Sequence, residues 1–285
     1  MNWLFAPGLF TSAPVHTALA LGTVSATVCA VVGVFTILRG ASFAGHALTD
    51  VAATGGAGSV LVGVSPLTGF LSGALVGAGA IGTTRGRGGH QQEVATGIVL
   101  SVATGLSALF LYLNATTSAA TGVTQRVLFG SLFSASSSEI LPTLLVGALA
   151  LLLTGVIARP LVLSSLSVEL ARARGVRVAL IGGAFLLTMA VAVGLSALTS
   201  GSLLSTALLI GPAAAAVRCT SRLSHALLLA LTFGIGCTWL GIVLSYDSYN
   251  WMPKNQSLPV SFFIVVAIVV VYGVCAIGST RGRRV

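Results

Sequence analysis

Charged side chains are scarce in this sequence. They make up 7% of its 285 residues, whereas hydrophobic residues make up 55%. Soluble globular domains carry about 25% charged residues, so this composition excludes a soluble domain with a single core. The 35 glycines suit transmembrane helices that approach one another closely. We therefore interpret the chain as an all-α polytopic membrane protein.

Lysine is nearly absent, and closely spaced cysteine pairs are absent. The four cysteines are widely separated and form no CxxC pair, which predicts neither a zinc knuckle nor a disulfide framework. Lys254 is the single lysine, and it falls in a predicted external loop. A phosphate-binding GxxxxGK[ST] loop is therefore excluded. If the chain transports a solute against a gradient, we expect ATP hydrolysis to take place on a separate subunit.

Hydropathy predicts about nine membrane spans in windows of about 19 residues, with eight or ten as the alternatives. The predicted spans run near 18–37, 44–64, 67–83, 94–113, 139–158, 178–198, 202–217, 226–246 and 259–278. No linker or low-complexity tail separates them. We expect residues 1–285 to form a single transmembrane permease domain.

The basic residues test this number of spans. All but Arg126 and Lys254 of the 14 basic residues follow odd-numbered spans. Because cytoplasmic loops collect arginine and lysine, the alternation predicts an external N-terminus and a cytoplasmic C-terminus. The residues after odd spans are Arg39, Arg85, Arg87, Arg159, Arg172, Arg174, Arg177, Arg218, Arg222, Arg281, Arg283 and Arg284. The net charge of +9 follows from this bias and does not indicate a nucleic-acid partner.

His46 and Asp50 are the candidate metal ligands. Asp50 is the only acidic residue that we place inside a span, and an ionisable group there is costly enough to suggest a function. On a helix, a spacing of four puts the imidazole and the carboxylate on one face. The alternative is a hydrogen-bonded pair that only joins this helix to a neighbour.

Two further features of the spans concern the backbone. Gly55 and Gly56, and likewise Gly211 and Pro212, are places where we expect a helix to break or bend and to form a gate. Irregular backbone at membrane depth is tolerated where it lines a cavity. Weak helix packing is the alternative explanation for Gly211 and Pro212 in the predicted span 202–217. Gly69, Gly73 and Gly77 recur at steps of four in 67–83 and predict a ridge for close helix packing.

The segment 159–177 is the predicted cytoplasmic coupling segment. Pro160 is expected to follow the end of its span, Ser165 to Ser167 offer an N-cap, and Gly175 supplies a C-terminal stop. A short charged helix between them suits either an interfacial helix on lipid headgroups or a docking element for a cytoplasmic protein. Its residues include Val168, Glu169, Leu170, Arg172 and Arg174.

Several segments, in order, resemble the ABC-3 family of membrane permeases from zinc and manganese ABC importers. These segments are Leu38–Gly45, Glu93 with Thr96–Val99, Leu128–Gly130, Leu170–Val176 and Leu209–Ala214. The family usually has Asp-x-x-x-His as its metal ligands after the first segment. Here the order is reversed, His46 before Asp50, which changes the group that lies deeper.

The resemblance implies a permease of the bacterial cytoplasmic (inner) membrane with no resident cofactor and a transported divalent ion, zinc or manganese. It also implies two cytoplasmic ATP-binding subunits that couple to residues 168–176, and an extracellular or periplasmic metal-binding protein. One chain offers two ligands, whereas zinc prefers four and manganese six. Two copies would supply two imidazoles and two carboxylates, so we expect a homodimer with the ion on its twofold axis.

Two other functions remain open at this stage. One is an ABC permease of the same architecture for a metal chelate or another small nutrient, in which His46 and Asp50 form a gate or a structural pair. The other is a proton-coupled secondary carrier. A proton relay normally needs several buried ionisable groups, and only these two fall inside the predicted spans, which disfavours a carrier.

Overall fold

The computed structural model of the chain describes residues 12–83, 89–117, 122–130, 132–134, 136–249 and 258–282. Within these ranges every regular element is a helix, which confirms the all-α class. The α-helices are α1 (Ala13–Leu38), α2 (Ser42–Val62), α3 (Pro66–Gly82), α4 (Gly89–Thr117), α5 (Val123–Phe129), α6 (Ile140–Leu166), α7 (Val168–Ala173), α8 (Val178–Ser200), α9 (Ser202–Cys219), α10 (Leu223–Ser248) and α11 (Val260–Gly282). Two 3₁₀ turns, η1 (Leu132–Ser134) and η2 (Ser137–Glu139), precede α6.

Each predicted span coincides with one long helix. Most of these helices extend beyond the predicted span at one end or both, because hydropathy does not register polar end residues that still have helical backbone. Among the described residues, α1, α4, α6, α8, α10 and α11 are long and apolar enough to cross a membrane, while α3 and most of α9 are shorter apolar helices. The chain is thus a multi-pass membrane protein, and the total of nine spans stays a prediction.

The prediction that the helix ends before Pro160 is wrong. Helix α6 continues through Pro160 to Leu166. Proline lacks an N–H and leaves the carbonyl of Val156 without its helical donor. The chain stays helical after Pro160 because Leu161 and Ser164 are buried against the bundle. Tertiary packing therefore overrides the local helix-ending signal.

The helices do not break at the predicted positions, whereas a bend or a gate there stays a prediction. Helix α2 runs through Gly55 and Gly56, and α9 runs through Gly211 and Pro212. These glycines make room for neighbours instead. A Cβ at Gly56 would lie 2.6 Å from the ring of Phe70, and one at Gly211 would collide with Ile268.

The predicted glycine ridge of α3 is confirmed as a packing surface. A Cβ at Gly55 of α2 would lie 2.8 Å from Cα of Gly73. A Cβ at Gly77 would lie 3.1 Å from the side chains of Leu48 and Val51. Such backbone-to-backbone contact is the usual way in which small residues join membrane helices. It holds α2 firmly against α3 and fixes the helix that carries His46 and Asp50.

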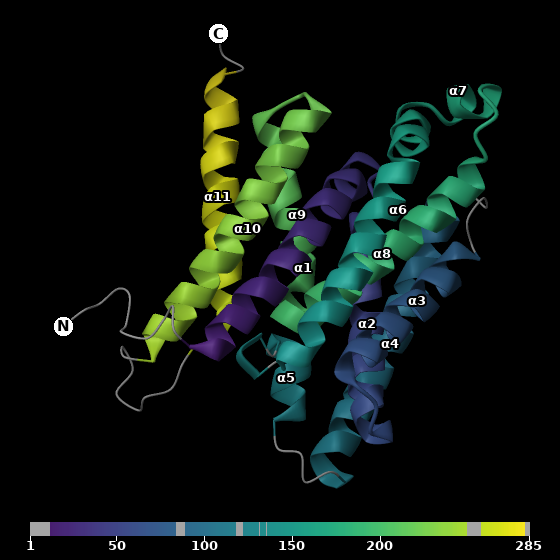
Figure 1. Cartoon of the computed structure of the whole chain (residues 1–285). Coiled ribbons are helices and arrows are strands. Elements are labelled where there is room, and N and C mark those ends of the chain that lie inside the picture. Colours follow the sequence, from purple (N-terminus) through teal and green to yellow (C-terminus); the bar gives the residue numbers. More distant parts are fainter. Residues whose placement is uncertain are drawn as a thin grey trace.

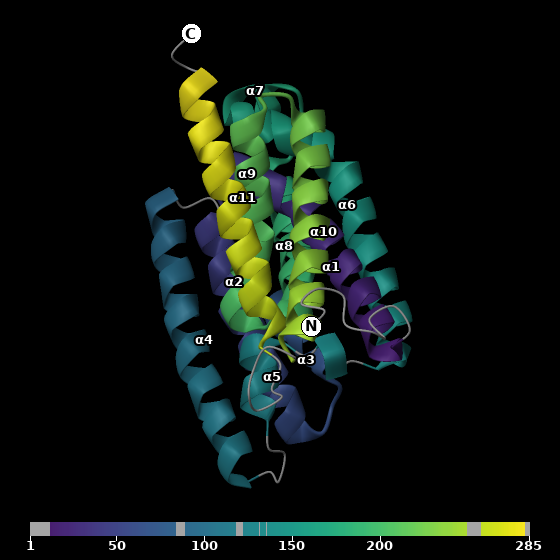
Figure 2. The same ribbon diagram turned by 90° about the vertical axis from the view of Figure 1, so that its left-hand side faces the viewer.

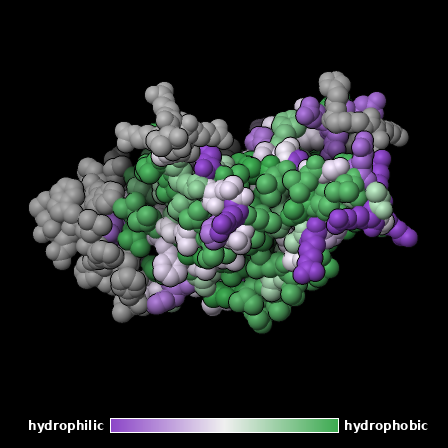
Figure 3. Space-filling view, turned by 90° about the horizontal axis from the view of Figure 1, so that it is seen from above, coloured by the Kyte–Doolittle hydropathy of each residue, from purple (hydrophilic) through white to green (hydrophobic). Residues whose placement is uncertain are grey.

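Helix α1 lies at the centre of the bundle, packed against α6, α8, α9 and α10. Helices α2, α3 and α4 form a group beside α8, and α4 stands at the edge of the molecule (Figure 2). The start of α1 and the end of α11 lie at opposite ends of the bundle, and α7 lies at the same end as the end of α11 (Figure 1). Seen from that end, hydrophilic residues gather mainly over the α7 side, and hydrophobic residues cover much of the flanks (Figure 3). The side that faces the cytoplasm stays a prediction.

Candidate metal site

The start of α2 is fixed by the turn that precedes it. Gly40 has φ +62° with no atom within 4 Å of a Cβ position, so this glycine serves the backbone conformation rather than a close contact. Arg39 donates from Nη1 to Ser164 Oγ at 2.9 Å and lies 5.7 Å from the ring centroid of Phe185. The upper end of α1 lies below those of α6, α10 and α11 (Figure 1). Helix α2 follows α1 directly after this turn, so it begins below the ends of those three helices.

His46 lies in the second turn of α2 and meets a cluster of hydroxyl groups. Its Nδ1 is 3.2 Å from Thr206 Oγ1 on α9. Thr206 Oγ1 in turn donates to Thr49 Oγ1 at 3.3 Å, and Thr49 donates to the carbonyl of Gly45 at 3.1 Å. Ser205 Oγ also donates to Thr49 Oγ1, at 3.2 Å. These contacts join α2 to α9 beside the imidazole.

The contact with Thr206 bears on the histidine tautomer. A threonine hydroxyl can donate or accept, so the tautomer decides the direction of the bond between Nδ1 and Thr206. In the tautomer with its proton on Nδ1, the imidazole donates to Thr206 and the lone pair of Nε2 is free. Metal-bound histidines are commonly oriented by a hydrogen bond from the other ring nitrogen. The imidazole of His46 is exposed on the single chain, so Nε2 is available to a ligand.

Asp50 follows one turn later and is half-buried. Its Oδ2 lies 2.9 Å from Thr104 Oγ1 of α4, a hydroxyl whose single proton the carboxylate shares with the carbonyl of Leu100, also at 2.9 Å. Among the described residues, no hydrogen-bond donor to Oδ1 is present. One carboxylate oxygen is therefore held in place, while the other is open to a cation.

Further polar contacts lock α4 beside α2. Thr54 Oγ1 lies 2.8 Å from both the carbonyl of Ala103 and Ser107 Oγ. Asn114 Nδ2 donates to the carbonyl of Ala57 at 2.9 Å. Side-chain hydrogen bonds between apolar helices favour association because the alternative is an unpaired polar group in hydrocarbon. The carboxylate of Asp50 thus faces a helix whose position is well determined.

A single chain does not complete a metal site within the described residues. No three His, Cys, Asp or Glu side chains in those ranges come close enough to hold an ion together. His46 and Asp50 offer one nitrogen and one oxygen. The glycines predicted as gate residues, Gly55 and Gly211, pack against neighbouring helices and do not contribute ligands.

The predicted coupling helix is present as α7. Ser167 caps it by accepting a hydrogen bond from the amide of Leu170 at 3.2 Å, and Gly175 (φ +77°) follows its end. Ala171 is fully buried and attaches α7 to the bundle. The other residues predicted for coupling are all exposed: Val168, Glu169, Leu170, Arg172, Arg174 and Gly175.

Sequence reasoning missed the hydroxyl cluster and a second buried acid. Thr49, Thr104, Ser205 and Thr206 are hydroxyl residues within apolar helices, a pattern that could have marked them as partners of an ionisable group. Asp247 is 2% exposed at the end of α10. Glu93 and Glu139 also fall within helices long enough to span a membrane. The prediction that Asp50 is the only acid inside a span stays a prediction, since these acids lie near the ends of helices that extend beyond the predicted spans.

These features define a multi-pass membrane protein with an ionisable pair at the start of an internal helix. The model of a protein family described as the ABC 3 transport family matches residues 13–272. The chain belongs to this family of ABC transporter permeases.

The relatives agree with this assignment. The manganese transport system membrane protein MntC of Listeria monocytogenes is 30% identical over 244 residues, which cover 85% of each chain. The MntC protein of Listeria innocua is 31% identical over the same length. Among solved structures, PsaBC from Streptococcus pneumoniae in complex with Fab matches with a TM-score of 0.80 and 26% identity, covering 94% of this chain and 92% of that one.

A more distant structure shares the fold alone. A chain from an inward-facing transporter assigned to the metal-chelate ABC type has a TM-score of 0.71 and 15% identity, covering 95% of this chain and 88% of that one.

Proposed function

We propose that this chain is the transmembrane subunit of an ATP-driven importer of a divalent transition-metal ion, manganese or zinc. The observation that carries the proposal is the paired geometry of His46 and Asp50. Each side chain contacts one hydroxyl, Thr206 or Thr104, and among the described residues each keeps one atom, Nε2 or Oδ1, without a hydrogen-bond partner. The manganese transport named for its 30% identical relative supports the same substrate class. The ion is the cargo, and no resident cofactor is proposed.

The ion is proposed to cross between two copies of the chain. One chain supplies one imidazole and one carboxylate, which is half of a tetrahedral set for zinc. Two copies supply two of each, and the two carboxylates neutralise the charge of a dication in a medium where an unpaired charge is very costly. His46 is exposed on the single chain, and α4 stands at the edge of the bundle (Figure 2). This side of the chain is therefore accessible to a second copy, which supports a shared site.

Two cytoplasmic ATP-binding subunits are proposed to dock on α7. This helix presents the exposed apolar side chains of Val168 and Leu170 between charged ones, while Ala171 anchors it. An exposed apolar surface on a rigid, capped helix suits a groove on a partner protein. An extracellular or periplasmic metal-binding protein would deliver the ion, and the complex would lie in the bacterial cytoplasmic membrane.

Uptake by the reconstituted complex tests the ligand assignment. We expect His46→Ala and Asp50→Ala each to abolish uptake of radioactive manganese or zinc into proteoliposomes, with the ATP-binding subunits still co-purifying. His225→Ala changes an exposed histidine in the first turn of α10 and should retain uptake. Unchanged uptake in both His46 and Asp50 variants would remove the assignment.

A permease for a metal chelate or another small nutrient is the second candidate. The observation that favours it is that both ionisable groups already have hydroxyl partners, as a purely structural pair would. The two candidates differ in their response to free ions. In the metal importer, ATP hydrolysis by the complex with its binding protein should rise with free manganese or zinc. A response to the chelate alone would favour the second candidate.

A further inference from the structure

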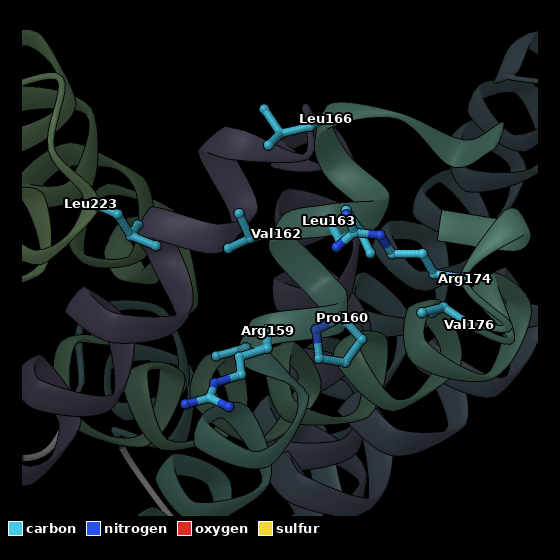
Figure 4. Close-up of a pocket in the computed structure, with 9 residues that line it drawn as sticks. Arg159, Pro160, Val162, Leu163, Leu166, Arg174, Val176 and Leu223 are labelled. Atoms are coloured by element: carbon cyan, nitrogen blue, oxygen red, sulfur yellow. The ribbon is translucent and has the colours of Figure 1, made fainter. Parts of the chain in front are cut away.

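A groove opens at the α7 end of the bundle, with a volume of about 700 Å³. Its main wall is the last part of α6, including Val162, Leu163 and Leu166, and Leu223 of α10 lies opposite (Figure 4). Two arginines also line it, Arg159 on α6 and Arg174 just after α7. In Figure 4 the side chain of Arg174 extends towards Leu163. The groove therefore combines an apolar wall with two guanidinium groups.

The charges of the groove have no counterpart within it. The sequence contains five acidic residues, Asp50, Glu93, Glu139, Glu169 and Asp247, and none of them lines the groove. Both arginines are exposed, and Leu166 is 80% exposed. An occupant that matches these walls has an apolar body and an anionic group.

The depth of the groove narrows the choice of occupant. Helix α6 has 27 residues, a length of about 40 Å at about 1.5 Å per residue, which exceeds the roughly 30 Å of a hydrocarbon core. The α6 residues of the groove lie between Ala158 and Leu166, whereas hydropathy ends the span at 158. The groove thus lies at the level of the lipid headgroups, on the side that the arginine bias predicts to be cytoplasmic.

We propose that this groove binds an anionic phospholipid. An acyl chain packs along Val162, Leu163 and Leu166, and the headgroup phosphate pairs with Arg159 and Arg174. Basic pockets between membrane helices are suited to anionic headgroups, and arginine matches phosphate oxygens in a bidentate manner. A water-soluble protein matches the groove less well, because the apolar wall belongs to a membrane helix. The surface proposed to bind a cytoplasmic protein is the exposed side of α7. The proposal does not depend on the identity of the transported solute.

Lipid retention measures this binding directly. The complex of the chain with its ATP-binding subunits is reconstituted in nanodiscs of phosphatidylcholine with a minor fraction of phosphatidylglycerol, extracted in mild detergent, and analysed by native mass spectrometry. We expect the complex to retain phosphatidylglycerol above its share of the bilayer. Arg159→Gln and Arg174→Gln should each lower that enrichment, by about fivefold per arginine.

Two further variants are controls. One tests whether the enrichment depends on the groove arginines rather than on positive charge in general, and the other tests whether it also depends on the apolar part of the groove. Arg177→Gln removes an exposed arginine from the same end of the bundle that does not line the groove, and should keep the enrichment. Val162→Trp keeps both groove arginines but fills the apolar part, and should lower it.

Three results would overturn the proposal. The first is equal loss of enrichment in the groove and control variants, which would indicate bulk charge attraction. The second is unchanged enrichment in Val162→Trp, which would indicate a phosphate contact without a bound chain. The third is unchanged enrichment in the arginine variants together with loss of the ATP-binding subunits, which would assign the groove to a protein partner.

Discussion

The hydroxyl of Thr206 on α9 lies 3.2 Å from Nδ1 of His46 on α2, although the two residues are 160 positions apart in the sequence. The tautomer that donates from Nδ1 to Thr206 keeps the lone pair of Nε2 free for a metal ion. The orientation of the proposed ligand therefore depends on a neighbouring helix. Four variants test the role of such contacts between helices. Three change residues around the proposed metal site, and one changes the cap of α7.

Removal of the Thr206 hydroxyl should weaken metal binding. Thr206→Val keeps the shape of the side chain but removes the hydroxyl that contacts Nδ1 of His46, and loss of such a partner typically costs about 10- to 100-fold in metal affinity. The measurement is the ion concentration that half-maximally stimulates ATP hydrolysis by the reconstituted complex. Thr206→Ser should restore the response. Thr232→Val, at an exposed threonine of α10 that bonds within its own helix, is the control, and equal behaviour of the two valine variants would contradict the prediction.

Removal of the Thr104 hydroxyl should alter the ion preference. In Thr104→Val both oxygens of Asp50 become available, and manganese favours more oxygen ligands than zinc does. We expect the ratio of half-maximal concentrations for manganese and zinc to shift in favour of manganese, whatever the change in total rate. Competition between the two ions in uptake assays measures this ratio. A parallel loss for both ions would show that Thr104 acts on helix packing alone.

The packing of α2 on α3 should depend on Gly55. Gly55→Ala introduces a Cβ that would lie 2.8 Å from Cα of Gly73, and backbone atoms cannot yield as a flexible side chain can. Overpacking of this kind costs about 1–3 kcal/mol. We expect a lower midpoint of thermal unfolding in detergent. Gly105→Ala on α4, where a Cβ meets no atom within 4 Å, should leave the midpoint unchanged or raise it, and a similar drop in both would refute the packing argument.

The cap of α7 should affect the ATP-binding subunit. Ser167→Ala removes the acceptor for the amide of Leu170, and loss of an N-cap costs about 0.5–2 kcal/mol of helix stability. Because α7 has only six residues, we expect fraying of its first turn and weaker retention of the ATP-binding subunits on gel filtration. Ser165→Ala, whose hydroxyl bonds within α6, serves as the comparison. Full retention in Ser167→Ala would mean that α7 is not the docking element.

The sequence predicted the helices well because their signals are local. Apolar runs identified the nine long helices that the described residues form, and Gly175 was correctly predicted to follow the end of α7. The predicted helix breaks at Gly55 and Gly211 and the predicted helix end before Pro160 failed for a different reason. Each residue has a local signal for a bend or a helix end, but its actual effect depends on the helix that packs against it.

The sequence by itself determined that this chain is a bundle of membrane helices and that His46 and Asp50 share one face of a helix, since a spacing of four is a property of helix geometry. Only the tertiary structure decided that Thr206 holds the imidazole and Thr104 the carboxylate. These partners come from α9 and α4, and the choice of neighbouring helices rests on contacts such as the approach of Gly55 to Gly73. Contacts of that kind join residues distant in the sequence, so no local pattern specifies them.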